Sequence, residues 1–429
     1  MKLIYLSLFL VIAIFTAPLR GANGSPSLSK SSTSFSLPVL LHPDGCLNAA
    51  LNITNSLTKI LSQQPAVKEA KKWRKFALKD LEFMYGQILK HHPGPVNKDD
   101  STFSAHLVKF YKEGLTHLCG IKNEDDYWKV MQRFAHSFDD THLRVFPIYR
   151  KKTGESVKNP MDEMPYCEMV CSDVYWIRIP TFGPTKDQQI ALEEIIKIMP
   201  SLRKSKALIF DIHDNGGGNS EWGHEIISSL FSKDYADQQN DLLNKSVYVE
   251  YRVSPENLAH WKTIAEKSSK DFGVKSESAR WWERVCTQME RALKKGVALI
   301  RVSGEEEKGE PLFVKEKFGH TVTAKIYAIV NRYCVSATLD FIDELKGLDY
   351  PITLWGETTG ADSLYMDVRS INLPSGQGQF IIPLKVYRGR KRGHNEPYKP
   401  DVVYTGNFED KSSLVKSIQD FLKPRLNIT

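Results

Sequence analysis

Ser336 is the first residue whose type and position could support covalent chemistry. It follows the apolar run of residues 325–330 and begins a predicted helix. A helix N-terminus and the amide of Ala337 would stabilise an attacking alkoxide and the oxyanion that it forms, so the position suits a nucleophile. The same position suits an ordinary N-cap serine, and Cys334 is a rival nucleophile. The residues of this segment alone leave these possibilities open.

A glycine turn is the second candidate. The apolar strand-like run of residues 207–211 is followed by Asn215 and three glycines, and then by a predicted helix. Backbone amides at Gly217 or Gly218 could approach a ligand closely and form an oxyanion hole, although a plain strand-to-helix turn has the same pattern. The spacing of a phosphate-binding loop is missing, and no lysine follows the glycines. Nucleotide binding is therefore not favoured.

An imidazole in the segment Asp139–Val145 is the third candidate. His142 follows Thr141 and could act as a general base, although a histidine at a helix end is more often a cap. His136 and His142 could also bind a metal with the nearby aspartates, but no HExxH spacing supports this. We predict neither a metal nor a cofactor.

The elements that must position these residues are predicted by their apolar spacing. A helix over residues 66–91 ends at His92-Pro93-Gly94, and two further helices complete a small bundle. After the bundle, strands and helices alternate, which indicates an α/β core. We read residues 232–322 as a charged, helical insertion. The other predicted helices are 101–118, 125–138, 186–199, 219–231, 255–270, 276–295, 336–345 and 411–422, and the strands are 174–179, 207–211, 325–330, 352–355, 379–386 and 402–404.

The N-terminal segment suggests export. Lys2 precedes an apolar run that is too short to span a membrane, so residues 1–24 are predicted to be a signal peptide, with an uncleaved anchor as the alternative. Residues 25–65 read as a low-complexity lead-in, residues 66–140 as the helical bundle and residues 141–429 as the α/β core. We expect a secreted or periplasmic protein without stable membrane insertion.

Composition excludes several classes of protein. The chain has 429 residues, of which 41% are hydrophobic and 25% are charged, as in ordinary globular proteins. Its net charge of +7 is spread along the chain, so nucleic-acid binding is not favoured. Six cysteines allow disulfides in an oxidising compartment, but the sequence does not choose their pairing. Cys167 and Cys171 have no second Cys or His pair nearby, so a disulfide or free thiols are favoured over zinc.

Taken in order, these segments resemble a known family. The chain contains DTHL at residues 140–143, DxxxNGGG at 211–218, VNRxxxSA at 330–337, GETTG at 356–360 and EPYKPDV at 396–402. The set resembles the C-terminal processing peptidase superfamily, which includes the tricorn core protease and the interphotoreceptor retinoid-binding proteins. The resemblance implies a crotonase-like β-β-α spiral core and cleavage of polypeptides by a serine nucleophile.

The resemblance assigns roles to individual residues. Ser336 matches the nucleophile, and Gly217 or Gly218 and Ala337 match the oxyanion donors. Ala361 stands where the processing-protease branch has its lysine base, so the chain looks more like the tricorn-like branch, whose histidine matches His142.

Further site residues follow from the same branch. It implies that Thr141 helps to orient the imidazole and that Glu396 is the third catalytic acid, with Glu357 and Asp401 as alternatives. His213 departs from the family, which often has arginine there.

Three functions compete on these observations. We expect a secreted serine peptidase that forms an acyl-enzyme. A catalytically inactive ligand- or peptide-binding protein on the same fold is the main alternative, because some relatives bind apolar ligands. An esterase is less favoured, since the G-x-S-x-G motif is absent. The sequence does not reveal the oligomeric state.

Overall fold

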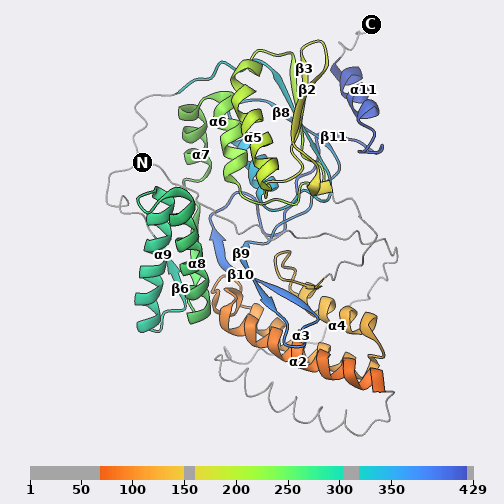
Figure 1. The fold of residues 1–429 in the computed structure, drawn as a ribbon, viewed down its shortest axis with the longest axis vertical. Coiled ribbons are helices and arrows are strands. Elements are labelled where there is room, and N and C mark those ends of the chain that lie inside the picture. The colour runs from red at the N-terminus through yellow and green to blue at the C-terminus, as the bar shows by residue number, and fades with distance from the viewer. Residues whose placement is uncertain (1–67, 149–159, 303–317, 423–429) are drawn as a thin grey trace, which may run out of the picture.

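The computed structural model describes residues 68–148, 160–302 and 318–422 (Figure 1). The predicted signal peptide and lead-in lie outside these residues and stay predictions. No helix in the described ranges is both long enough and apolar enough to cross a membrane.

A six-stranded sheet forms the upper part of the molecule in Figure 1. Its strand order is β11-β8-β7-β4-β3-β2, and all neighbours are parallel except the edge pair of β2 and β3. The central strand β4 is buried along its whole length, as its unbroken apolar run predicts. The strands are β2 (Tyr166–Cys171), β3 (Val174–Arg178), β4 (Ala207–Asp211), β7 (Lys325–Val330), β8 (Ile352–Gly356) and β11 (Val402–Val403).

Helices cover both faces of this sheet. Four of them share one apolar core with the sheet, and the helix α11 packs on the opposite face through Leu414 and Ile418. Local sequence fixes their ends, as at α5, where Thr185 and Gln188 form a capping box. The helices are α5 (Lys186–Ile198), α6 (Glu221–Phe231), α7 (Lys233–Leu243), α10 (Ala337–Gly347) and α11 (Lys411–Leu422).

A second, five-stranded antiparallel sheet lies in the lower part of the molecule. The long strand β10 is its centre, because β1, β5 and β9 all pair with it, and β6 extends β5. The strands are β1 (Arg144–Pro147), β5 (Tyr248–Arg252), β6 (Leu299–Arg301), β9 (Tyr365–Asn372) and β10 (Gly378–Arg388).

The predicted N-terminal bundle packs against this second sheet. Side chains of its helices share one core with β10 and with two further helices, α8 and α9 (Figure 1). The bundle helices are α2 (Lys68–His91), α3 (Phe103–His117) and α4 (Glu124–His136), and the others are α8 (Pro255–Phe272) and α9 (Glu277–Lys294). The predicted α/β class with a preceding helical bundle is thus confirmed, whereas the crotonase-like spiral and the domain boundaries stay predictions.

Residues 232–322 contain more than the two predicted helices. They also provide α7, which packs on α6, and the strands β5 and β6, which extend the second sheet. Both strands were missed because they are short and only partly buried, so their sequence lacks the alternation of a half-buried strand.

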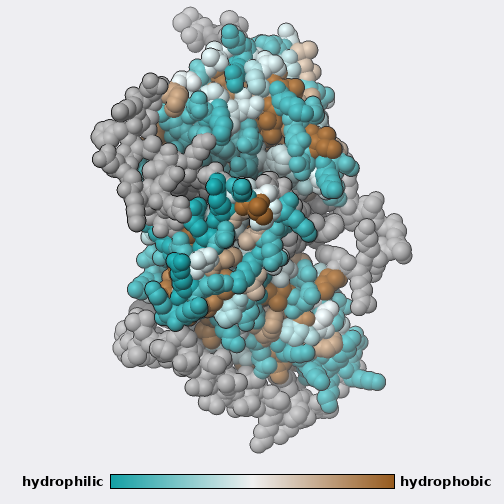
Figure 2. Space-filling view, turned by 60° about the vertical axis from the view of Figure 1, so that its left-hand side comes forward, coloured by the Kyte–Doolittle hydropathy of each residue, from teal (hydrophilic) through white to brown (hydrophobic). Residues whose placement is uncertain are grey.

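The cysteines and the surface complete the description. All five cysteines within the described ranges are free thiols, so no disulfide forms among them. On the face shown in Figure 2, hydrophilic side chains predominate and the apolar ones form separate small spots.

Candidate active site

Ser336 occupies a strained turn between β7 and α10. Its backbone angles are φ 59° and ψ −131°, a region that non-glycine residues rarely adopt, and its side chain makes no capping hydrogen bond. The alternative of an ordinary N-cap serine is therefore not what the structure shows. A strain of about 1–3 kcal/mol persists only where the surroundings impose it, and such strain is typical of functional sites.

The glycine turn packs directly against this serine. A Cβ added to Gly217 would lie 2.6 Å from the Cβ of Ser336 and 3.0 Å from the amide nitrogen of Ala337. A Cβ on Gly218 would lie 2.1 Å from the backbone of Phe182. Both glycines also have positive φ, of 95° and 141°. Only glycine fits at these two positions, so the last two glycines of the run have a steric cause.

The amides around Ser336 differ in their availability. The Gly217 N–H donates to Oδ1 of Asn215 at 2.9 Å. Within the described chain, the N–H groups of Gly218 and Ala337 donate no hydrogen bond. Of the two glycines that the sequence left open, Gly218 is therefore the one with a free N–H, and it directly follows the glycine that packs against Ser336.

Asn215 ties the glycine turn to α10. Its side-chain oxygen accepts a hydrogen bond from Oγ1 of Thr338 at 2.7 Å, and its carbonyl accepts one from the same hydroxyl at 2.9 Å. Its amide group donates to the carbonyl of Ile179 at 3.0 Å. Asn215 is completely buried. The distance between the glycine amides and the start of α10 is thus set by one fully bonded side chain.

Asp362 holds the backbone of Ser336 in place. The Ser336 N–H donates to both carboxylate oxygens of Asp362, at 3.0 and 2.9 Å. Asp362 is itself buried, and Nη1 of Arg392 lies 3.7 Å from it. Asp362 has no motif around it that would single it out, since its partner Ser336 lies on another segment of the chain.

Arg392 joins Asp362 to a charged network on α10. With Arg390 it contacts the carboxylates of Asp340 and Asp343. Burial alone would raise the pKa of Asp340, but the two arginines outweigh it and hold that pKa below its usual range. This network borders a cavity of about 190 Å³ next to α10.

The DTHL motif is fixed by its aspartate. Oδ1 of Asp140 accepts the N–H of His142 at 2.9 Å and the hydroxyl of Ser363 at 2.7 Å. Oδ2 accepts from Nε2 of His92 at 3.0 Å, and Nδ1 of His92 accepts the N–H of Gly94 at 2.9 Å. The helix stop His92-Pro93-Gly94 therefore has a second role, because it anchors the motif that carries His142.

The pKa of Asp140 is consistent with its hydrogen bonds to His92 and His142. Burial alone would raise the pKa of Asp140, but the hydrogen bond and charge of His92 outweigh it and hold that pKa below its usual range. A carboxylate that stays ionised can keep the backbone of His142 in one orientation.

The loop at residues 361–363 connects the serine with the histidine segment. Asp362 bonds Ser336, while the next residue, Ser363, donates its N–H to Oγ1 of Thr141 at 3.3 Å. Two segments that are far apart in the sequence, one with Ser336 and one with Thr141, are thus bonded to one loop. The Nδ1 atom of His142 is buried and has no hydrogen-bond partner in the described part of the chain.

The three acids proposed from the sequence make other contacts. The carboxylate of Glu396 accepts the N–H of Gly393 at 2.7 Å, Glu357 pairs with Arg332, and Asp401 accepts the N–H of Leu354. None of them bonds the ring of His142 among the described residues.

Glu396 nevertheless lies in a turn that belongs to the site. Its neighbour Asn395 donates its side-chain amide to the carbonyl of Asp139 and its backbone N–H to the carbonyl of Asp362, the latter at 2.8 Å. The turn at residues 393–396 is therefore bonded both to the segment that carries His142 and to the loop at residues 361–363.

Cys334 is poorly suited to be the nucleophile. It is completely buried, and its thiol donates to the carbonyl of Ile212 at 3.1 Å. Burial raises the pKa of Cys334 to about 12, so the reactive thiolate is scarce at neutral pH. The exposed His136 is in no group that could hold a metal within the described ranges, and neither is His142.

Replacing Gly217 with alanine is expected to damage both the fold and the site. The new Cβ would overlap Ser336 at a positive φ, so we expect the free energy of unfolding to fall by about 1–3 kcal/mol. We also expect peptidase activity to fall about 10²-fold if the free amides of Gly218 and Ala337, which this change would shift, act as oxyanion donors.

Gly216 offers a matched control for that substitution. A Cβ there would meet only the flexible side chain of Met161, at 3.3 Å. Urea unfolding and peptide hydrolysis should show little change for Gly216→Ala, and equal effects of the two substitutions would contradict the steric argument.

Comparison with known proteins identifies the class. The model of peptidase family S41 matches residues 173–404, which is more than half of the chain and contains both the glycine turn and Ser336. The fold and this match define a serine-type peptidase. The chain belongs to peptidase family S41, which confirms the resemblance to the C-terminal processing peptidases.

Solved structures with a similar fold have low sequence identity to this chain. A lipoprotein from Streptococcus agalactiae is 15% identical with a TM-score of 0.39, over 82% of this chain and 97% of that chain. Mature CPAF complexed with lactacystin is 14% identical with a TM-score of 0.49, over 81% and 98%. A putative peptidase from Parabacteroides merdae ATCC 43184 is 13% identical with a TM-score of 0.42, over 80% and 96%. Likenesses of this size identify no site residue, and no curated protein matches the chain.

Proposed function

We propose that this chain is a secreted serine peptidase that cleaves polypeptides through an acyl-enzyme on Ser336. The observation that carries the proposal is a serine with a strained backbone and no capping hydrogen bond, packed against the glycine turn. The N–H groups of Gly218 in that turn and of Ala337 at the start of α10 donate no hydrogen bond to the described residues. A strained nucleophile next to preorganised donors is what acyl transfer requires.

In the first half of the proposed reaction, His142 takes the proton of the Ser336 hydroxyl as its oxygen attacks the substrate carbonyl. The tetrahedral oxyanion accepts hydrogen bonds from the amides of Gly218 and Ala337, while Gly217 provides the space. Collapse of the intermediate breaks the C–N bond, and His142 returns the proton to the leaving amine. Water then hydrolyses the ester by the same steps.

Positioning residues complete the proposed site. Thr141 links His142 to the loop at residues 361–363, and Asp362 fixes the amide of Ser336. We propose Glu396 as the acid that orients the imidazole, because its turn is bonded to Asp139 and Asp362. Its exposed carboxylate would have to exchange the amide of Gly393 for Nδ1 of His142.

A covalent probe tests the proposal directly. The purified protein is incubated with a peptidyl phosphonate that reacts with serine nucleophiles, and the adduct is located by mass spectrometry of its peptides. We expect one adduct per chain, on Ser336. An adduct on Cys334, or no adduct on a folded protein, would contradict the proposal, and the second result would favour a binding protein.

A further inference from the structure

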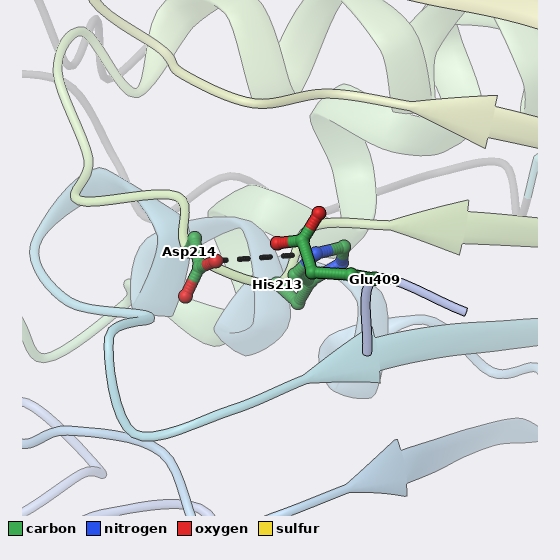
Figure 3. Close-up of side chains that lie close together, drawn as sticks. All are labelled: His213, Asp214 and Glu409. Atoms are coloured by element: carbon green, nitrogen blue, oxygen red, sulfur yellow. Dashed lines mark ion pairs between the residues drawn. The ribbon is translucent and has the colours of Figure 1, made fainter. Parts of the chain in front are cut away.

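A group of metal-ligand atoms lies outside the proposed peptidase residues. His213, Asp214 and Glu409 each offer one such atom, and these atoms all lie within 4.8 Å of one another. Figure 3 shows the three side chains converging, two from the end of β4 and one from the loop after β11. His213 is the residue that departs from the family pattern, and nothing in the proposed reaction uses it.

The ring of His213 is buried and held in one orientation. Its side chain is 7% exposed, and its Nδ1 contacts the carboxylate of Asp211. Asp211 also accepts from Nε1 of Trp176 at 3.1 Å and lies 3.6 Å from the guanidinium of Arg178. An ionised carboxylate at Nδ1 keeps the ring proton there, so Nε2 presents its lone pair to the group.

Asp214 directs one oxygen toward that lone pair. Its Oδ1 accepts from the side-chain amide of Asn331 at 2.7 Å, and its N–H donates to the Asn331 oxygen at 3.0 Å. The other oxygen, Oδ2, lies 3.9 Å from Nε2 of His213 (Figure 3). Asp214 keeps this position at a positive φ of 60°.

Glu409 approaches from a different part of the chain. Its N–H donates to Oδ1 of Asn407 at 3.0 Å, which shapes the turn. The ring of the preceding residue, Phe408, packs 5.7 Å from the ring of His213. The loop thus packs against the histidine ring, and a carboxylate oxygen of Glu409 lies within 4.8 Å of the ligand atoms of His213 and Asp214.

The chemistry of the group is unbalanced without a cation. Nε2 and two carboxylates are all acceptors, and Nε2 makes no hydrogen bond with the described residues. The nearby Arg178 is already engaged by Glu163 and by the carbonyl of His213. His213 is buried, Asp214 is half-buried and Glu409 is exposed. Three converging acceptors, of which the imidazole is buried, attract a positive ion.

We propose that His213, Asp214 and Glu409 bind one zinc-type divalent cation. One imidazole nitrogen and two carboxylate oxygens suit zinc, with a carboxylate behind the imidazole as in many zinc sites. Ligands about 2 Å from a shared metal lie within about 4 Å of each other, so small side-chain movements would complete the site.

The cation would join two segments of the fold. Asp214 directly precedes Asn215 and the glycine turn, whereas Glu409 belongs to the loop between β11 and α11. Binding would therefore fasten the C-terminal loop to the base of the glycine turn. No HExxH spacing predicts this site, because it combines two adjacent residues with one far along the chain.

Zinc binding to the chelator-treated protein tests the inference without any use of peptidase activity. Accessible thiols are first alkylated, because free cysteines also bind zinc. Titration calorimetry with zinc chloride should then show one site per chain. We expect Asp214→Asn and Glu409→Gln each to weaken binding at least 10-fold, and Glu193→Gln, an exposed acid on α5, to leave it unchanged.

Cobalt(II) supplies a second readout. Its visible spectrum should report nitrogen and oxygen ligands in the wild type, and this spectrum should be lost in His213→Gln. Absence of zinc binding would overturn the proposal. Equal zinc affinity of the wild type, Asp214→Asn and Glu409→Gln would place the ion elsewhere and would also overturn it.

Discussion

Replacing Ser336 with alanine is expected to lower kcat for peptide hydrolysis about 10⁴- to 10⁶-fold, because the acyl-enzyme can no longer form. Hydrolysis should still be faster than the uncatalysed reaction in water, since the amides of Gly218 and Ala337 are intact. The stability of the fold should hardly change. Alanine keeps the Cβ and the strained φ of 59°, and the Ser336 side chain makes no capping hydrogen bond that would be lost.

Glycine at the same position provides a matched comparison. It removes the nucleophile and also relieves the backbone strain, at the cost of a more flexible unfolded chain. We expect Ser336→Gly to be as inactive as Ser336→Ala but more stable by up to about 2 kcal/mol in urea unfolding. A Ser336→Ala protein that retains more than a tenth of the wild-type kcat would exclude Ser336 as the nucleophile.

The strands and helices around the site were predictable because their signals are local. The buried strand β4 is a continuous apolar run, and its predicted bounds agree with the structure, as do those of β7 and α11. The helix α2 was predicted to within two residues, since its apolar face repeats every three to four residues. The strands β5 and β6 lack such a pattern, and only their pairing with β10 and with each other reveals them.

The choice between competing site residues depends on burial and on distant contacts. Without the family resemblance, Cys334 rivals Ser336 as a nucleophile in sequence, and only the structure shows that its thiol is buried and donates to Ile212. Gly217 and Gly218 differ because Asn215 binds the first amide. Asp362 could not be singled out, since its role depends on one contact with a residue of another segment.

The position of His142, the proposed base, also depends on contacts between distant segments. The motif around His142 is recognisable in sequence, but its attachment to Ser363 and to the buried His92 is a property of the fold. Helices α2–α4, which lie before the matched family region, thereby contribute to the site. A version of this protein that lacks them would leave Asp140 without its partner.

Replacing His142 with glutamine is expected to lower kcat/KM about 10²- to 10⁴-fold, the usual contribution of general-base catalysis. Glutamine has a similar size but cannot take the proton of Ser336. The rate of phosphonate labelling at Ser336 should fall with it, because that reaction needs the same proton transfer. The thermal unfolding midpoint should change little, since Nδ1 of His142 bonds no described residue.

His136→Gln is the matched control for this substitution. His136 is exposed at the end of α4, close to the motif in sequence, and should keep wild-type kinetics. Equal kinetics for His142→Gln and the wild type would show that another group removes the proton. A loss confined to KM would instead assign His142 to substrate binding, because a base that acts only in the transition state lowers kcat.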